Sequence, residues 1–424
     1  MLKAVKRHYH WVIALLAFLE TIVFGGLLNS ANVFVIPVCE TFQETRGNYA
    51  LAQVPYNLIC FFSSMATGYV FNRFGYKKSA IFSLILITGS LVLTAVSQNL
   101  LVYGISKAIM AVGYGVCLTA GTVRIVKDWF WKHQGLVVGA ISMATGFGGS
   151  LMSIVLTDII GRSGWRAANF FAAVLMALIA ASFLLLKNRP EEMGLKPFGY
   201  GQPQKKIKKA RAEDHDWPGY SLKELLKHPV FYIMIFCTFG ACLFLYMCLG
   251  VVVMHFQDVG YSPAEAANFQ SVMMLCLAVA KLLAGGLCDK IGPKPVSIIC
   301  MVCGVVGLLI MSEMTDPLWC YIGVSIFAVS LSMTSIMIPL LAAPLFGYRA
   351  CITVNGIFLS MSSLANMIAN PASNILYDRI GSYIPVFRGA ALGSAVLVVV
   401  YLILFAAAKA DKNRYFRQEA KNEI

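Results

Sequence analysis

Long stretches without a charged side chain recur along the whole sequence. Two examples run from Ile81 to Gln98 and from Ala390 to Ala408. About 20 consecutive apolar residues cross a bilayer as one helix, and continuous apolarity favours helices over the alternating pattern of barrel strands. Because 58% of the residues are hydrophobic and only 13% are charged, the chain has more apolar surface than a soluble core hides. The sequence predicts an all-α membrane protein.

Counting these runs predicts twelve transmembrane helices in two groups of six. They are expected at residues 11–34, 51–71, 79–97, 101–124, 136–159, 167–187, 230–253, 267–287, 295–312, 318–341, 352–374 and 385–408. A linker at 188–229, rich in Pro, Gly and charge, would separate a six-helix bundle (1–187) from a second one with a short tail (230–424).

The basic residues predict the orientation, because Lys and Arg accumulate on the cytoplasmic side of a membrane protein. Only five lie in loops opposite the two termini: Arg46, Arg162, Arg166, Arg379 and Arg388. We therefore expect a multi-pass protein of the cytoplasmic membrane with both termini in the cytoplasm. The net charge of +14 then reflects topology, not nucleic-acid binding. The basic run from Lys205 to Arg211 is either a solvated linker or a contact to lipid head groups.

A short basic loop occurs twice, as GYVFNRFGYKK from Gly68 to Lys78 and as GGLCDKIGPK from Gly285 to Lys294, offset by 217 residues. The first copy contains Gly68, Asn72, Arg73, Gly75 and Lys78, and the second contains Gly285, Asp289, Lys290 and Gly292. An even number of predicted helices separates the copies, which indicates a parallel internal repeat.

This repeated loop resembles the signature loop of the major facilitator superfamily, and the chain is identified as a member of that family. The resemblance implies a transporter without enzymatic activity, working as a monomer, in which the loop latches the cytoplasmic side. We expect Gly68 and Gly285 to permit close helix approach, and Gly75 and Gly292 to form tight turns. Since Asn72 replaces the usual Asp, the second copy is predicted to be the stronger latch.

Further stretches are similar to the monocarboxylate porter and oxalate/formate antiporter-like branch of the family. They run from Gly113 to Gly135, Ser163 to Phe171, Asn188 to Gly199, His255 to Ala267 and Tyr377 to Tyr383. The segment from Gly146 to Ser150 partly resembles a glycine-rich motif of antiporters, but close packing of small residues explains it equally well.

Ionisable side chains inside membrane helices are costly and are functional candidates. Lys281 lies four residues before Gly285, the spacing at which the branch holds a cation for the substrate carboxylate, although the family usually has Arg there. Glu20 either carries a coupling proton and contacts substrate or pairs statically with Lys281. Lys107 is predicted to serve proton coupling or structure, and Arg124 lies nearer the cytoplasmic end.

Together these features predict a secondary transporter of a small organic anion, coupled to protons or to a counter-anion. The predicted substrate-binding residues are Lys281, Glu20, Tyr246 and Asn355. The segment from Ile352 to Ser373 has no charge, so a single dominant cation fits a monocarboxylate better than a dianion. The alternatives are an efflux carrier for lipophilic compounds, suggested by 19 Met and 27 Phe, and a non-transporting membrane sensor. We expect contacts with membrane lipids and no metal, cofactor or disulfide.

Overall fold

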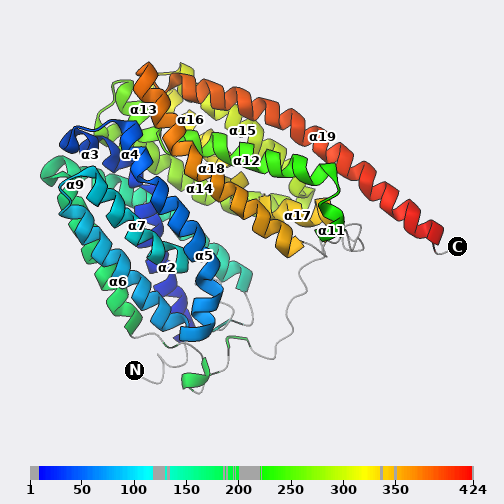
Figure 1. Cartoon of the computed structure of the whole chain (residues 1–424), viewed down its shortest axis with the longest axis horizontal. Coiled ribbons are helices and arrows are strands. Elements are labelled where there is room, and N and C mark those ends of the chain that lie inside the picture. The colour runs from blue at the N-terminus through cyan, green and yellow to red at the C-terminus, as the bar shows by residue number, and fades with distance from the viewer. Residues whose placement is uncertain are drawn as a thin grey trace. The chain divides into compact units, whose positions relative to one another are not determined.

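The computed structural model describes residues 9–117, 129–130, 134–184, 187, 190–193, 195, 197–199, 220, 222–334, 338–347 and 351–422. This part of the chain is helical, and its only β-structure is an isolated bridge between Phe130 and Phe198 (Figure 1). Arg124 and the basic run from Lys205 to Arg211 lie outside the described residues.

The chain forms two compact units. Unit 1 comprises Met1–Lys205, Val251–Ala278 and Asn374–Ser382, and unit 2 comprises Lys206–Gly250, Val279–Ser373 and Tyr383–Ile424. Seven helices are long and apolar enough to cross a membrane, and three shorter apolar helices accompany them in the described part. Where the predicted spans fall on described residues, those residues are mostly helical, so the predicted all-α membrane fold is confirmed.

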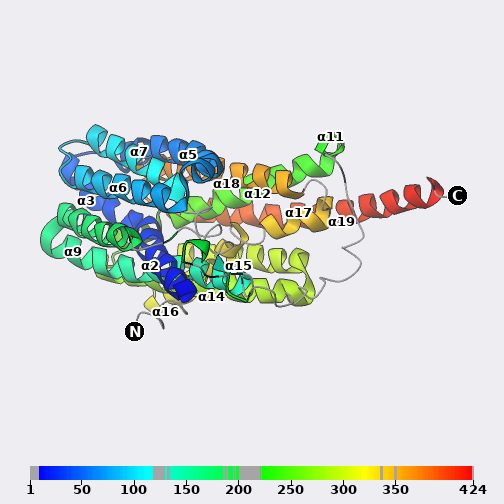
Figure 2. The same cartoon turned by 90° about the horizontal axis from the view of Figure 1, so that it is seen from below.

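Unit 1 contains the helices of the first half. They are α2 (Tyr9–Asn29), η1 (Ala31–Phe34), α3 (Val35–Phe42), α4 (Arg46–Ala52), α5 (Val54–Phe74), α6 (Tyr76–Ala95), α7 (Leu100–Cys117), α9 (Gln134–Leu184) and η2 (Pro190–Met193). Helix α9 packs against α2 and α6, and α7 packs against α5 and α6 (Figure 2). Unit 1 also includes α13 (Val252–Asp258), the first part of α14 (Pro263–Ile291) and the end of α18 (Cys351–Ile380).

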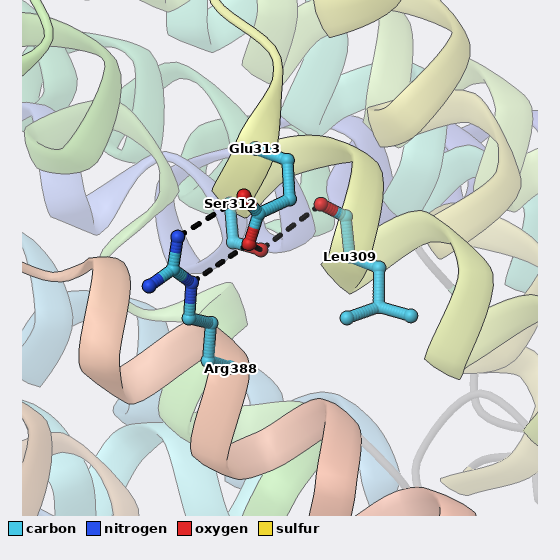
Figure 3. A network of polar contacts seen from close by, with 4 residues as sticks. All are labelled: Leu309, Ser312, Glu313 and Arg388. Carbon is cyan, nitrogen blue, oxygen red and sulfur yellow. Dashed lines mark hydrogen bonds and ion pairs between the residues drawn. The ribbon is translucent and has the colours of Figure 1, made fainter.

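Unit 2 is built around α15. It contains α11 (Leu222–Leu225), α12 (Pro229–Leu249), α15 (Pro293–Glu313), α16 (Pro317–Ser332), α17 (Ile338–Phe346), α19 (Ile384–Asn422) and the remainders of α14 and α18. Helix α15 packs against α16 and α19, and α12 packs against α19. Arg388 of α19 donates two hydrogen bonds to Glu313 of α15, at 2.7 and 3.0 Å (Figure 3).

Local sequence explains where several helices begin. Proline stands in the first turn of α5, α12, α15 and α16, where its missing N–H costs no hydrogen bond. The Thr45 hydroxyl accepts a bond from the Asn48 amide at 3.1 Å and so caps α4. Ser262, 217 residues later, caps α14 in the same way through the Glu265 amide at 3.3 Å.

The backbone repeats the 217-residue offset seen in the sequence. Positive φ angles occur in three matched pairs: Gln43 (55°) with Gly260 (110°), Gly75 (78°) with Gly292 (87°), and Gly164 (81°) with Gly381 (76°). Side chains other than glycine rarely adopt these angles. The two halves of the chain therefore turn at the same places.

The first predicted span of each half is interrupted near its end. The predicted span 11–34 divides into α2 and η1, with α3 following directly, and the span 230–253 divides between Leu249 and Val252. The Ser30 hydroxyl donates to the Gly26 carbonyl at 2.7 Å at the first break. Apolar runs do not reveal such breaks because the hydrophobicity continues through them. The predicted connection near 160–166 lies at Gly164 (φ 81°, ψ 166°), where two helical segments of α9 meet at a non-helical residue.

Candidate functional site

The three predicted intramembrane charges lie on three helices. Glu20 of α2 is 5% exposed, whereas Lys107 of α7 and Lys281 of α14 are half-buried. Glu20 and Lys107 belong to unit 1, and Lys281 belongs to unit 2. The surroundings of each charged side chain are therefore described within the unit to which it belongs.

Lys281 lies at the border between a buried and an exposed face of α14. Ala280 and Ala284 on its two sides are buried, while Leu282 and Leu283 are exposed. No hydrogen bond or ion pair to the Lys281 ammonium is formed by the described residues.

Tyr246 and Asn355, the other predicted binding residues of unit 2, are both half-buried and are associated with α18. The Tyr246 hydroxyl shares a 3.2 Å hydrogen bond with the Ser362 hydroxyl of α18. Asn355 lies seven residues before Ser362, which places both on the same face of α18. This face offers hydroxyl and amide groups.

Lys107 lies against aromatic rings. Its Nζ is 5.2 Å from the centre of the Tyr103 ring, one turn earlier on α7, and 6.0 Å from the Phe34 ring in η1. Glu20 lies nine residues before the end of α2 at Asn29, about 14 Å along the helix axis. Since η1 follows that end, Lys107 and Glu20 occupy different depths, and the structure does not bring these two predicted proton-coupling residues together.

The repeated loop has one backbone geometry in both copies. Gly75 (φ 78°, ψ 159°) and Gly292 (φ 87°, ψ 162°) each stand at the N-terminus of the following helix. Their amides donate to the Phe71 and Cys288 carbonyls, at 3.0 and 2.9 Å. These angles are essentially restricted to glycine, so the predicted tight turns are present.

The structure describes only some of the remaining side chains of the predicted latch. A Cβ at Gly285 would meet no heavy atom of the described residues within 4 Å, so these residues make no close helix approach there. Arg73 donates to the Tyr69 hydroxyl at 2.6 Å, and Lys78 and Lys290 are exposed. The side chains of Asn72 and Asp289, and the surroundings of Gly68, lie outside the described structure, so the unequal latch stays a prediction.

A cluster that sequence reasoning missed joins distant segments within unit 1. Arg46 donates two hydrogen bonds to Asp258, at 2.7 and 2.9 Å, and its guanidinium lies 4.1 Å from the centre of the Tyr377 ring. Asp378 accepts the Gly47 amide at 2.8 Å. We call these five residues the Arg46 cluster. Asp258 and Asp378 lie in the family-like stretches, and that was the available signal.

The start of α14 is bound to α2 and α9 by polar groups. Gln270, which is fully buried, donates to the Asn29 carbonyl at 2.8 Å. Asn29 in turn donates to the Thr145 carbonyl at 3.1 Å, and the Ser150 and Ser271 hydroxyls lie 2.7 Å apart. Buried polar groups satisfied in this way favour one arrangement of the helices.

The glycine-rich stretch of α9 provides close helix packing. A Cβ at Gly148 would collide with the backbone of Ile22 and Gly26 in α2, and one at Gly146 would lie 2.7 Å from Ala278 of α14. Only hydrogen atoms fit at these crossings. The packing interpretation therefore accounts for this stretch.

Known proteins show the same sequence pattern and fold. The model of the Major Facilitator Superfamily matches residues 12–350 and again residues 244–422. The uncharacterized MFS-type transporter YcxA of Bacillus subtilis is 20% identical over 93% of this chain and 95% of its own length. Monocarboxylate transporter 13 of Bos taurus is 23% identical over 68% of this chain and 63% of its own length.

Solved structures agree at the level of the fold. The nucleoside transporter NupG superposes with a TM-score of 0.73 at 14% identity, covering 93% of this chain and 98% of its own. A D-xylose-proton symporter gives a TM-score of 0.70 at 16% identity, with 93% and 97% covered. With the family match over nearly the whole chain, these results lead to one conclusion: the chain belongs to the Major Facilitator Superfamily of membrane transporters, which are not enzymes.

Proposed function

We propose that the chain moves a small organic anion, a monocarboxylate, across the cytoplasmic membrane by alternating access. The observation that carries this proposal is Lys281, a half-buried cation within α14 that forms no ion pair among the described residues. A charge held inside a membrane helix at this cost is a functional candidate. The similarity to monocarboxylate transporter 13 and to monocarboxylate transporters 14, 9 and 7 supports the substrate class.

In this proposal Lys281 binds the substrate carboxylate as a point charge. Tyr246 and Asn355 provide hydrogen bonds to the rest of the substrate from α12 and from the polar face of α18. Because the sequence from Ile352 to Ser373 adds no second cation, a singly charged anion balances the site.

Glu20 is the proposed carrier of a coupling proton. It is a buried carboxylate in α2, and intramembrane carboxylates commonly mark proton relays and substrate pathways. Exchange against a second anion is the other mode of coupling. A pH gradient would drive uptake by proton coupling. A carboxylate on the opposite side of the membrane would drive uptake by exchange.

Alternating access requires contacts that form on one side of the membrane and break in each cycle. With both termini in the cytoplasm, as proposed from the basic residues, the Arg46 cluster closes the outer side. The loops containing Gly75 and Gly292 then serve the cytoplasmic side. The cluster has to open for substrate to pass outward.

Uptake into proteoliposomes tests the proposal. Radiolabelled acetate, succinate, a bile acid and a neutral amphiphile would be compared for wild type, Lys281→Gln and Lys227→Gln, an exposed-lysine control. We expect acetate uptake by wild type and the control, and its loss in Lys281→Gln. Uptake of the amphiphile independent of Lys281 would indicate efflux of lipophilic compounds. Binding of acetate without uptake by any variant would indicate a sensor.

A thermal-shift measurement supports the uptake assay, because it needs no assumption about direction or coupling. A ligand at a hundred times its Kd stabilises the folded protein by roughly 2.7 kcal/mol. Acetate should raise the melting temperature of wild type more than that of Lys281→Gln.

A further inference from the structure

We propose that Lys107, Tyr103, Tyr49 and Phe34 form a second anion site, within unit 1, that binds a carboxylate. The proposal rests on the proposed function only in naming a carboxylate as the anion. Lys107 and Lys281 belong to different units, so each site has its own cation.

Aromatic rings stabilise the charge of Lys107 without using its hydrogen bonds. The Tyr103 and Phe34 rings lie 5.2 and 6.0 Å from Nζ, within the range of cation–π attraction. An ammonium group has three N–H donors and no acceptor. No hydrogen bond or ion pair to Lys107 is formed by the described residues, so these donors remain available.

A second donor belongs to the tyrosine pair that includes the ring beside Lys107. The Tyr49 and Tyr103 hydroxyls are 3.0 Å apart, and both side chains are buried. One of their two protons bridges the two oxygens. The other proton has no acceptor among the described residues. A buried donor without an acceptor is costly, which makes an incoming acceptor favourable.

The two observations point to one kind of ligand. The site presents N–H and O–H donors with a positive charge and no acceptor, so it selects an anion. A carboxylate has two oxygens, which suits two donors of different kinds, and its carbon body can contact the ring faces of Phe34 and Tyr103. A halide ion provides neither feature.

The position of the site in the fold supports a transport role. Phe34 belongs to η1, the segment that interrupts the first membrane helix between α2 and α3. Transporters of this general architecture bind substrate where helices are discontinuous. Arg46 and Gly47 of the Arg46 cluster belong to helix α4, which also contains Tyr49. Tyr49 therefore links the site to the helix that carries Arg46.

Equilibrium binding of radiolabelled acetate to the purified full chain tests the proposal. The parent variant is Lys281→Gln, which removes the cation of the proposed transport site. In that background we compare Lys107→Met, the double change Tyr49→Phe with Tyr103→Phe, and Lys187→Met as an exposed-lysine control. Chloride and acetamide serve as competitors.

We expect the parent and the Lys187 control to bind acetate, and Lys107→Met to lose at least tenfold in affinity. The double phenylalanine variant removes both members of a buried hydrogen bond for apolar groups of similar shape, which is close to neutral for folding. It should nevertheless bind acetate about tenfold more weakly, the effect of one lost charge-assisted hydrogen bond.

Unchanged acetate affinity in both Lys107→Met and the double phenylalanine variant would overturn the site. Equal competition by chloride or acetamide would overturn its selectivity for carboxylate. The proposed function fails separately, through acetate uptake that does not depend on Lys281. That failure would leave the second site standing, provided that acetate binding in the Lys281→Gln parent depends on Lys107.

Discussion

Arg46 and Asp258, 212 residues apart in the chain, are joined by two hydrogen bonds of 2.7 and 2.9 Å. Both side chains are largely shielded, at 16% and 22% exposure. An ion pair of this geometry contributes more than an exposed one. If the pair closes the outer side, its loss should favour the outward-open state.

We expect Asp258→Asn to shift the equilibrium between the outward-closed and outward-open states toward the open state. The shift should be about 1–2 kcal/mol, a factor of roughly 5–30. The rate at which the native thiol of Cys39 is alkylated measures this shift. Cys39 is buried, at 8% exposure, and its thiol lies 3.7 Å from the Thr45 carbonyl next to Arg46, so it reacts slowly while the cluster is closed. Alkylation of Cys39 by a membrane-impermeant maleimide should accelerate in Asp258→Asn. Asp158→Asn, which breaks the exposed Arg162 pair, should leave the rate unchanged.

Gly47→Ala tests the same closure by steric means. A Cβ at Gly47 would collide with the Asp378 carboxylate and lie 3.2 Å from Ile375 Cγ1, so the carboxylate has to leave the Gly47 amide. We expect faster Cys39 alkylation, as for Asp258→Asn. Gly389→Ala is the control, since a Cβ there meets nothing within 4 Å. Equal rates in the two variants would show that the Gly47 contact does not hold the outer side closed.

The two loop glycines should respond alike to alanine. Gly75 and Gly292 have nearly the same φ and ψ, in a region that costs other residues about 1–3 kcal/mol. Gly75→Ala and Gly292→Ala should therefore lower the thermal unfolding midpoint in detergent by similar amounts. Gly89→Ala, in open space on α6, should not lower it. A large effect from only one loop glycine would contradict the structural repeat.

Gly148→Ala should separate α2 from α9. The new Cβ would meet the main chain of Ile22 and Gly26, which cannot rotate away, and overpacking of this kind costs about 1–3 kcal/mol. The unfolding midpoint should fall. Gly161→Ala on the same helix α9, with nothing within 4 Å of its Cβ, provides the comparison. A midpoint as high as in this control would exclude tight packing at Gly148.

The sequence was most informative where a residue type and a backbone geometry are tightly linked. Gly75 and Gly292 were predicted to form turns because glycine alone suits them. The pair of Gln43 and Gly260 shares a left-handed geometry too, but the residues differ, so no sequence pattern marks it. The break after Ser30 was hidden because the apolar run continues through it.

The partners of charged residues were harder to predict. Lys281, Glu20 and Lys107 stood out because charge is rare in apolar helices, yet the rings around Lys107 come from η1 and from its own helix. The pairing of Arg46 with Asp258 depends on how distant helices pack. Both residues looked like ordinary loop charges in the sequence.

The matched turns have a consequence for chain length. The same number of residues separates Gln43 from Gly164 as separates Gly260 from Gly381. The two intervals therefore have the same length in both halves. Because helix length sets the bilayer thickness that a bundle fits, the two bundles are matched to the same membrane. A chimera that exchanged the two intervals would keep every turn in register.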